Sequence, residues 1–224
     1  MRILLSDGSG LTARQVVTRL SALGHEVEAV SSTWWCLTRF TVHVRRIHRV
    51  PPFQTDAPGW FKALLDILQK RAIDVLLPTQ EQVAWLSAYR RQISVPTVLP
   101  GFSALSRVQD KIAAFETLTA LAIPQPMGCV VRSPTEKRED MAFPVFVKRP
   151  ISTASSGVRR ADDVAGLASA MSELGDDQFL VQEAVPGPVA MVQTVADDGR
   201  LVALHANMRL REGAGGAPPS RRAL

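Results

Sequence analysis

Lys148 is the residue whose place in the sequence points most directly to chemistry. It follows an apolar run, residues 143–147, that is typical of a buried strand, and small or hydroxyl residues dominate the segment 151–157 after it. A cation at the end of a buried strand must reach solvent or an anionic partner. Backbone N–H groups and hydroxyls of small residues can approach phosphate oxygens. By itself, the stretch fits a nucleotide phosphate site and an exposed turn equally well.

Two other segments favour the nucleotide site. Asp110 and Lys111 begin a predicted helix 37 residues before Lys148, and Gln182 and Glu183 end a predicted strand 34 residues after it. With a second lysine before it and a polar strand end after it, Lys148 becomes a candidate phosphate contact.

The turn at residues 6–10, SDGSG, raises an alternative. A glycine-containing turn between a first strand and a helix is where dinucleotide folds hold pyrophosphate, and Ala13 is an accepted variant of the last glycine in that fingerprint. The acidic residue expected about 20 positions further on is not clear, because Glu28 lies inside the next predicted strand. A structural turn is therefore favoured, and Trp34 and Trp35 are interpreted as core or interface aromatics.

Strands and helices alternate in the first hundred residues. Apolar runs predict strands at 2–5, 25–32, 43–50 and 74–78, and helical spacing predicts helices at 11–24, 57–71 and 79–93. Such alternation is typical of a parallel sheet, so residues 1–100 are predicted to form one small doubly wound α/β domain.

The pattern changes after residue 100. It predicts helices at 110–123 and 161–174, strands at 127–131, 143–149 and 179–182, and a β-hairpin over 189–210 whose turn is Asp197, Asp198 and Gly199. The tail, residues 212–224, is flexible in composition. These elements predict a separate α+β unit.

The order of the segments DK, IPQP, FPVFVKRP, SSGV, FLVQEAVPG and DDGRLVA resembles the ATP-grasp superfamily. It is most similar to the branch that contains carbamoyl-phosphate synthase, biotin carboxylase and carboxylate–amine ligases, and DVLLPTQEQ resembles part of the preceding pre-ATP-grasp domain. The resemblance covers nearly the whole chain. It implies an α/β fold with a Rossmann-like pre-ATP-grasp domain at 1–100 and an incomplete α+β ATP-grasp domain at 101–224. In the second domain the lid would occupy about 125–185, and the start of the catalytic lobe 186–224.

The resemblance also implies roles for individual residues, with ATP and Mg²⁺ as cofactors. Lys111 and Lys148 match the two lysines that contact nucleotide phosphates. The flexible lid loop is matched by Ser152, Thr153, Ser155, Ser156 and Gly157. The hinge that receives adenine on its backbone is matched by Gln182, Glu183, Ala184 and Val185, with Glu183 in a position to hold the ribose hydroxyls. Arg209 and Arg211 match the catalytic cations that meet the transferred phosphoryl group or the substrate carboxylate.

The sequence departs from the family pattern in two ways. The lid loop has one glycine where the family has several, and the sequence stops at Leu224, before the acidic residues and asparagine that hold magnesium in the family. We therefore expect an ATP-binding protein related to carboxylate–amine ligases, with a small carboxylate as substrate, whose metal site is not complete in these residues. The alternatives are a non-catalytic ATP-grasp module that acts by binding or association, including as a homo-oligomer, and a dinucleotide-binding domain.

Composition excludes several other classes. Of the 224 residues, 46% are hydrophobic and 21% are charged, as in ordinary globular proteins, and the short apolar runs predict no membrane span. The net charge of +5 comes from scattered basic residues, a pattern that disfavours nucleic-acid binding. Cys36 and Cys129 have no metal-ligand spacing with each other or with the histidines. They predict a reduced, cytoplasmic protein.

Overall fold

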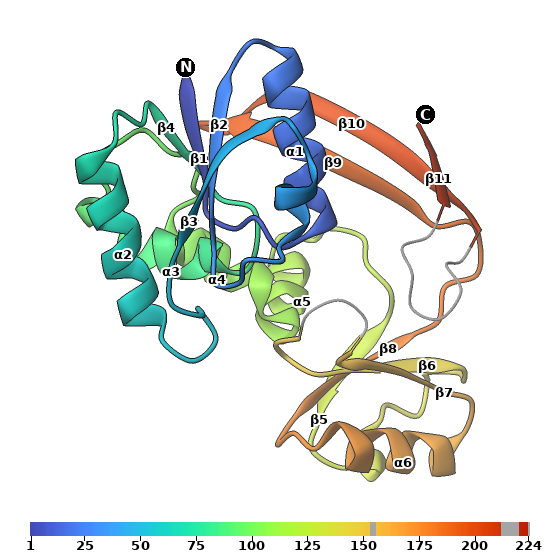
Figure 1. Cartoon of the computed structure of the whole chain (residues 1–224). Coiled ribbons are helices and arrows are strands. Elements are labelled where there is room, and N and C mark those ends of the chain that lie inside the picture. The colour runs from blue at the N-terminus through green and yellow to red at the C-terminus, as the bar shows by residue number, and fades with distance from the viewer. Residues whose placement is uncertain (153–155, 212–219, 224) are drawn as a thin grey trace. The chain divides into compact units, whose positions relative to one another are not determined.

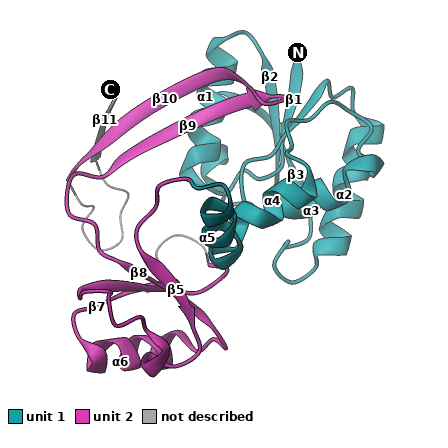
Figure 2. Cartoon of the chain, turned by 180° about the vertical axis from the view of Figure 1, so that it is seen from behind, with its two compact units in different colours: residues 1–122 teal, residues 123–224 magenta. Residues whose placement is uncertain are grey.

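The computed structural model describes residues 1–152, 156–211 and 220–223 (Figure 1). Its contacts divide the chain into two compact units, residues 1–122 and residues 123–224 (Figure 2). Helix α4 (Phe102–Gln109) contacts helix α3 (Gln82–Ala88), and helix α5 (Lys111–Ala120) contacts α4. These helices therefore belong to the first compact unit, and a boundary between folding domains near residue 100 stays a prediction.

The first unit is a parallel sheet with helices on both faces. Its strands stand in the order β3-β2-β1-β4, and every neighbouring pair is parallel. In chain order, the elements before α4 are β1 (Arg2–Leu5), α1 (Leu11–Ala22), β2 (Glu26–Ser31), the 3-10 turn η1 (Leu37–Phe40), β3 (Val44–Arg49), α2 (Ala57–Lys70), β4 (Val75–Leu77), α3 and the 3-10 turn η2 (Arg90–Gln92). The predicted doubly wound arrangement is confirmed.

Alternation along β1 assigns its side chains to two cores. Ile3 and Leu5 join the core under α1, whereas Leu4 joins the larger core formed with α2 and α3. All three residues are buried. Burial of both faces explains why this strand is a continuous apolar run rather than an alternating one.

The loop between β2 and β3 is anchored to the turn that follows β1. The backbone N–H and the Oγ1 hydroxyl of buried Thr38 both donate to the Gly8 carbonyl, at 3.2 and 2.9 Å. A Cβ on Gly8 would lie 2.5 Å from Thr38 Oγ1, so a larger residue does not fit there. From this loop Trp34 and Trp35 reach solvent, with 56% and 78% of their surface exposed. The core interpretation of these tryptophans is wrong, and the interface interpretation stays a prediction.

The second unit contains a four-stranded antiparallel sheet in the order β5-β8-β6-β7. Its elements are β5 (Gly128–Val131), the 3-10 turn η3 (Pro134–Glu136), β6 (Val145–Lys148), β7 (Val158–Ala161), α6 (Val164–Leu174) and β8 (Phe179–Glu183). One face of this sheet packs against α6. The buried residues of that core are Val131, Met141, Val145, Val147, Ala161, Leu167, Ala170, Met171, Leu174, Phe179 and Val181.

A long hairpin follows in the same unit. Strand β9 (Ala190–Asp197) pairs antiparallel with β10 (Arg200–Arg211), and β10 also pairs with β11 (Ser220–Ala223). Asp198 and Gly199 have φ values of 46° and 76°, as a tight two-residue hairpin turn requires. The predicted hairpin and its turn are confirmed. Helix α4 and strands β7 and β11 were not predicted.

Candidate nucleotide site

Lys148 lies on the face of the second unit's sheet that is opposite α6. Its neighbours Val145 and Val147 are fully buried against α6, and side chains alternate along a strand, so Phe146 and Lys148 point the other way. Gln182 is the register partner of Phe146 and shares this face. Lys148 Nζ donates to Gln182 Oε1 at 2.7 Å, diagonally across the two strands. The structure thus brings together two predicted site residues that lie 34 positions apart in the sequence.

The loop from β6 to β7 begins directly after Lys148. Its base is closed by a hydrogen bond from Arg149 N to the Gly157 carbonyl, at 2.9 Å, and by an ion pair between Arg149 Nε and Asp176 Oδ2, also at 2.9 Å. Gly157 is closely covered by Ser152, since a Cβ on Gly157 would lie 2.2 Å from Ser152 Cβ. The glycine in this loop is therefore required by local packing. Thr153 and Ser155 lie outside the described residues, whereas Ser152, Ser156 and Gly157 lie within them.

The predicted hinge is tied to the start of β5. Glu183 N donates to the Met127 carbonyl at 3.0 Å, and Met127 N donates back to Glu183 Oε1 at 3.1 Å. Ala184 N donates to the Pro144 carbonyl at 3.0 Å, and Val185 is 63% exposed. The backbone of Glu183 and Ala184 is thus fixed by the residues that directly precede β5 and β6. The chain becomes exposed at Val185.

Lys111 belongs to the first unit, at the beginning of α5. The carboxylate of Asp110 caps this helix by accepting from Ile112 N at 2.8 Å and from Ala113 N at 3.1 Å. Burial lowers the pKa of Lys111, and the nearby negative charge of Asp110 only partly offsets this effect. The positive end of a helix dipole also disfavours a cation at this position. Lys111 therefore occupies a place where an approaching anion would be favourable.

The predicted catalytic arginines lie on the last part of β10. Arg209 N donates to the Val189 carbonyl at 2.8 Å, which fixes the backbone at this end of the hairpin. The side chain of Arg211 lies outside the described part of the chain. The assignment of both arginines to catalysis stays a prediction.

The SDGSG turn uses its polar groups inside the protein. Gly8 N donates to the Val30 carbonyl at 2.8 Å, and the Asp7 carboxylate accepts from Ser9 N and Ser9 Oγ at 3.0 and 2.6 Å. Asp7 and Ser9 also line a cavity of about 60 Å³ at the carboxyl ends of the strands. Sites for drug-sized ligands have volumes of roughly 300 Å³ or more, so this cavity is too small for a dinucleotide. The geometry supports the structural turn.

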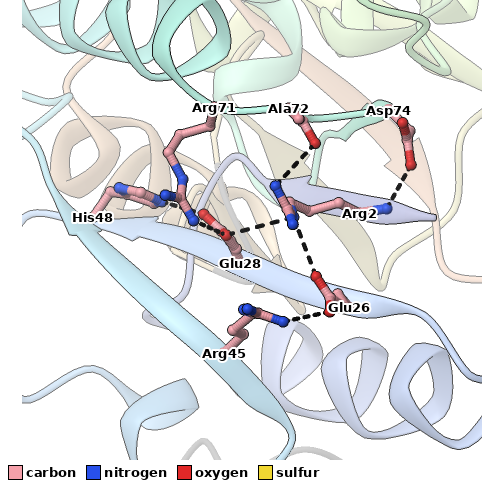
Figure 3. Close-up of polar contacts among 8 residues, drawn as sticks. All are labelled: Arg2, Glu26, Glu28, Arg45, His48, Arg71, Ala72 and Asp74. Carbon is pink, nitrogen blue, oxygen red and sulfur yellow. Dashed lines mark hydrogen bonds and ion pairs between the residues drawn. The ribbon is translucent and has the colours of Figure 1, made fainter.

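A buried ion cluster lies on the parallel sheet of the first unit (Figure 3). The sequence did not predict that its residues meet. Glu28 is fully buried, and its two oxygens accept from Arg71 Nη2 at 2.7 Å and pair with His48 Nε2 at 2.5 Å. Burial alone would raise the pKa of Glu28, but the hydrogen bonds and charges of Arg71 and His48 outweigh it and lower that pKa. The only sequence signal is a glutamate inside an apolar strand. The cluster joins β2, β3 and the end of α2, a structural role.

The described residues contain neither a candidate metal site nor a membrane-spanning helix. Within residues 1–152, 156–211 and 220–223, no group of three His, Cys, Asp or Glu side chains could hold a metal ion. None of the described helices is both long and apolar enough to cross a membrane.

This chain is similar in sequence to one curated protein and similar in structure to several solved proteins. No family model matches the sequence. The D-alanine–D-alanine ligase of Nocardia farcinica is 32% identical over 130 residues, which are 54% of this chain and 36% of that ligase.

The solved structures match over nearly the whole chain. The L-amino acid ligase of Bacillus licheniformis gives a TM-score of 0.72 at 15% identity, over 93% of this chain and 50% of that one. N5-carboxyaminoimidazole synthetase from Staphylococcus aureus gives 0.70 at 15% identity, over 97% and 56%. The biotin carboxylase domain of the Hydrogenobacter thermophilus 2-oxoglutarate carboxylase, a complex with MgADP and bicarbonate, gives 0.70 at 14% identity, over 94% and 50%.

These matches confirm the ATP-grasp resemblance at the level of the fold. The parallel sheet of the first unit and the antiparallel sheets of the second correspond to the fold of these enzymes. The chain spans about half the length of the solved structures that it matches.

Proposed function

We propose, from this ATP-grasp fold, that the chain binds ATP and that the protein belongs to an ATP-dependent carboxylate–amine ligase lineage. In such a reaction a carboxylate is phosphorylated by ATP, and an amine then displaces the phosphate. The protein contributes mainly by positioning the reactants and stabilising charge. A small carboxylate is the proposed substrate.

The observation that carries the proposal is the position of Lys148. Its ammonium group is held by the Gln182 amide on the face of the sheet opposite α6, next to the loop that follows β6. The amide oxygen of Gln182 is a neutral acceptor, so this hydrogen bond orients the ammonium group without neutralising its charge. An aspartate or glutamate at position 182 would instead have cancelled that charge.

The hinge supports binding of the adenine ring beyond Glu183. The backbone N–H groups of Glu183 and Ala184 already donate to the residues that directly precede β5 and β6, whereas Val185 is exposed and followed by proline. We propose that adenine is read by the Ala184 carbonyl and by the backbone of Val185, because the Ala184 N–H is already engaged. Ser152, Ser156 and Gly157 supply the small residues that approach the phosphates.

We further propose that this polypeptide binds nucleotide without turning it over. Magnesium in phosphoryl transfer is held by carboxylates together with phosphate oxygens. Near Lys148, the carboxylate of Asp176 pairs with Arg149, and that of Glu183 accepts from Met127 N. Both are already engaged in the structure. Magnesium would therefore arrive with ATP and be held chiefly by the phosphates.

Titration calorimetry with MgATP tests the binding proposal. Lys148→Ala removes one charged hydrogen bond to phosphate, worth about 1.5–3 kcal/mol, which weakens binding roughly 10- to 150-fold. Arg138→Ala, the same change of charge at an exposed ion pair with Asp140, should leave binding unchanged. Equal binding by wild type and Lys148→Ala would refute the proposed phosphate contact.

A coupled assay of ADP release tests the absence of turnover. Wild-type protein is incubated with MgATP and mixed amino acids, and ADP is measured over time. Magnesium-dependent ADP release that disappears in Lys148→Ala would overturn the second proposal and leave the first intact. Binding with no release supports both.

The second candidate is a module that acts by association. It is favoured by the exposure of the β9–β10 hairpin, on which Val192, Leu201 and Leu204 are each more than half exposed.

A further inference from the structure

The small cavity at the carboxyl ends of the parallel strands lies wholly within the first unit. Its volume is about 60 Å³, and its polar lining consists of Asp7, Ser9, Ser31, Ser32, Gln54 and Gln82. After β1 the chain continues to α1 on one face of the sheet, and after β4 it continues to α3 on the other face. The strand order β3-β2-β1-β4 therefore reverses its direction at β1 and β4. Open α/β sheets bind ligands outside the carboxyl ends of their strands at such a reversal.

Gln82 is a buried polar side chain in the wall of this cavity. Only 6% of its surface is exposed, and its Oε1 atom accepts no hydrogen bond from any described residue. Leaving a buried polar group without a partner is costly. The amide can turn its oxygen or its N–H groups toward the cavity by rotating about its last bond. A ligand in the cavity would give Gln82 a partner that the described fold does not supply.

Asp7 selects the charge of that ligand. Its Oδ2 atom accepts both hydrogen bonds from Ser9, one from the backbone N and one from Oγ. Its Oδ1 atom receives no hydrogen bond within the described part of the chain. An ionised carboxylate accepts hydrogen bonds and donates none. The cavity therefore favours a positively charged group that carries hydrogen-bond donors.

Several donors of the lining are already used inside the protein. Ser31 Oγ donates to the Thr33 carbonyl at 2.9 Å, and Val50 N donates to the Ser31 carbonyl at 3.1 Å. Ser9 gives both its N–H and its hydroxyl to Asp7. These groups cannot serve an anion without breaking bonds that hold the loops, so the lining is better suited to a cation.

Hydrogen bonds between two loops hold the site in place. Thr79, in the loop between β4 and α3, donates from its backbone N to Ser6 Oγ and from its Oγ1 to the Asp7 carbonyl, both at 3.0 Å. Gln82 begins α3 three residues later. The positions of Asp7 and Gln82 are therefore coupled through the backbone before any ligand binds.

We propose that this cavity binds the ammonium group of a small primary amine. Such a group carries one positive charge and three N–H donors. One donor meets Asp7 Oδ1 and another meets the Gln82 amide oxygen after the amide has rotated, whereas Ser32 and Gln54 offer acceptors for the third. A divalent metal ion is a poorer ligand, because Asp7 is the single carboxylate of the described lining.

The volume of the cavity limits the size of the bound group. A water molecule occupies roughly 30 Å³ in the liquid, so the cavity has room for an ammonium group and about one carbon. The rest of a longer amine would extend toward solvent past Ser9 and Gln54, which are both exposed. The inference concerns the first unit alone and does not rest on ATP binding.

NMR titration of the ¹⁵N-labelled chain with methylammonium chloride, without nucleotide, tests the site. We expect saturable shifts of the Gln82 side-chain amide and of the backbone signals of Asp7 and Ser9. Tetramethylammonium chloride has the same charge but no N–H donor, and at equal ionic strength it should leave these signals unchanged. Equal shifts with both cations would show a general effect of charge, and no shift with methylammonium would show a cavity that holds water only. Either result would overturn the proposal.

Ammonium chloride, titrated in parallel, separates the free ion from the amine. Binding of both ammonium and methylammonium supports a site for an amine head group. If ammonium bound and methylammonium did not, the ligand would be the free ion and the proposed amine would be wrong.

Three variants test the assigned contacts. Asp7→Asn removes the charge but keeps an acceptor for Ser9, and it should weaken methylammonium binding roughly tenfold or more. Glu81→Gln removes the same charge at an exposed position outside the cavity lining, and it should leave binding unchanged. Gln82→Leu should weaken binding several-fold and yet melt at or above the wild-type temperature, because it removes a buried polar group that has no partner in the described fold. Unchanged binding in folded Asp7→Asn or Gln82→Leu protein would refute the proposed site.

Discussion

Replacing Gly157 with alanine tests the structure of the candidate phosphate loop most directly. The new Cβ would lie 2.2 Å from Ser152 Cβ and 2.3 Å from Ser152 Oγ, distances at which atoms cannot coexist. Ser152 must move, and with it the loop closed by the Arg149 N–Gly157 O hydrogen bond. Overpacking of this kind costs about 1–3 kcal/mol. We expect a corresponding loss in the free energy of unfolding and weaker ATP binding.

The rescuing change is Ser152→Gly. If the clash with Ser152 causes the loss, Gly157→Ala should lower the free energy of unfolding much less in a Ser152→Gly protein than in wild type. Urea unfolding of the four proteins gives the coupling energy, and calorimetry with MgATP gives the binding energy. A Gly157→Ala protein as stable as wild type, or a double variant with no recovery, would refute the packing described for this loop.

Three further predictions concern other sites. Glu28→Gln should cost about 2–3 kcal/mol at pH 7, because it breaks a buried charged pair. The pKa of Glu28 is lowered from 4.5 in the folded protein, so its carboxylate stabilises the fold above pH 4.5, and this stabilisation is lost as the pH falls through the folded pKa. The free energies of unfolding of Glu28→Gln and wild type, measured in urea, should therefore converge in acid. Lys111→Met should slightly raise the melting temperature at pH 7, because a lysine pKa lowered by folding means that the charged ammonium destabilises the folded state. The same variant should bind ATP more weakly than wild type. Glu183→Gln keeps an acceptor for Met127 N, so stability should persist, and a loss of ATP affinity by calorimetry would then show that the carboxylate itself holds the ribose.

The fold could be predicted because its elements are strongly patterned. The continuous apolar runs of β1 and β4 and the amphipathic repeat of α2 need no tertiary information, and their alternation selects a parallel sheet. Helix α4 was not predicted because it has only eight residues and directly follows a proline–glycine pair, which indicates a loop; none of its residues is buried. Strand β7, VRRA, has two arginines in four residues, and only pairing with β6 makes it a strand.

The candidate site was predictable in its residue types but not in its contacts. Lysine, small residues and a polar strand end can be recognised in the sequence. The bond from Lys148 to Gln182 depends on the register of β6 against β8, which is set by how Val145, Val147 and Val181 fill the core under α6. A slip of one residue would turn Lys148 toward that core. The register, and thus the site, is a consequence of packing.

The same alternation separates Gln182 from Glu183. Gln182 shares the face of Lys148, so the side chain of Glu183, the next residue on β8, begins on the opposite side of the strand, where it accepts from Met127 N. For its carboxylate to hold a ribose beside phosphates at Lys148, the side chain would have to reach around the strand end from the opposite face. Gln182 is already in contact with Lys148, so we expect Gln182→Ala to weaken ATP binding more than Glu183→Gln does when both are measured by calorimetry.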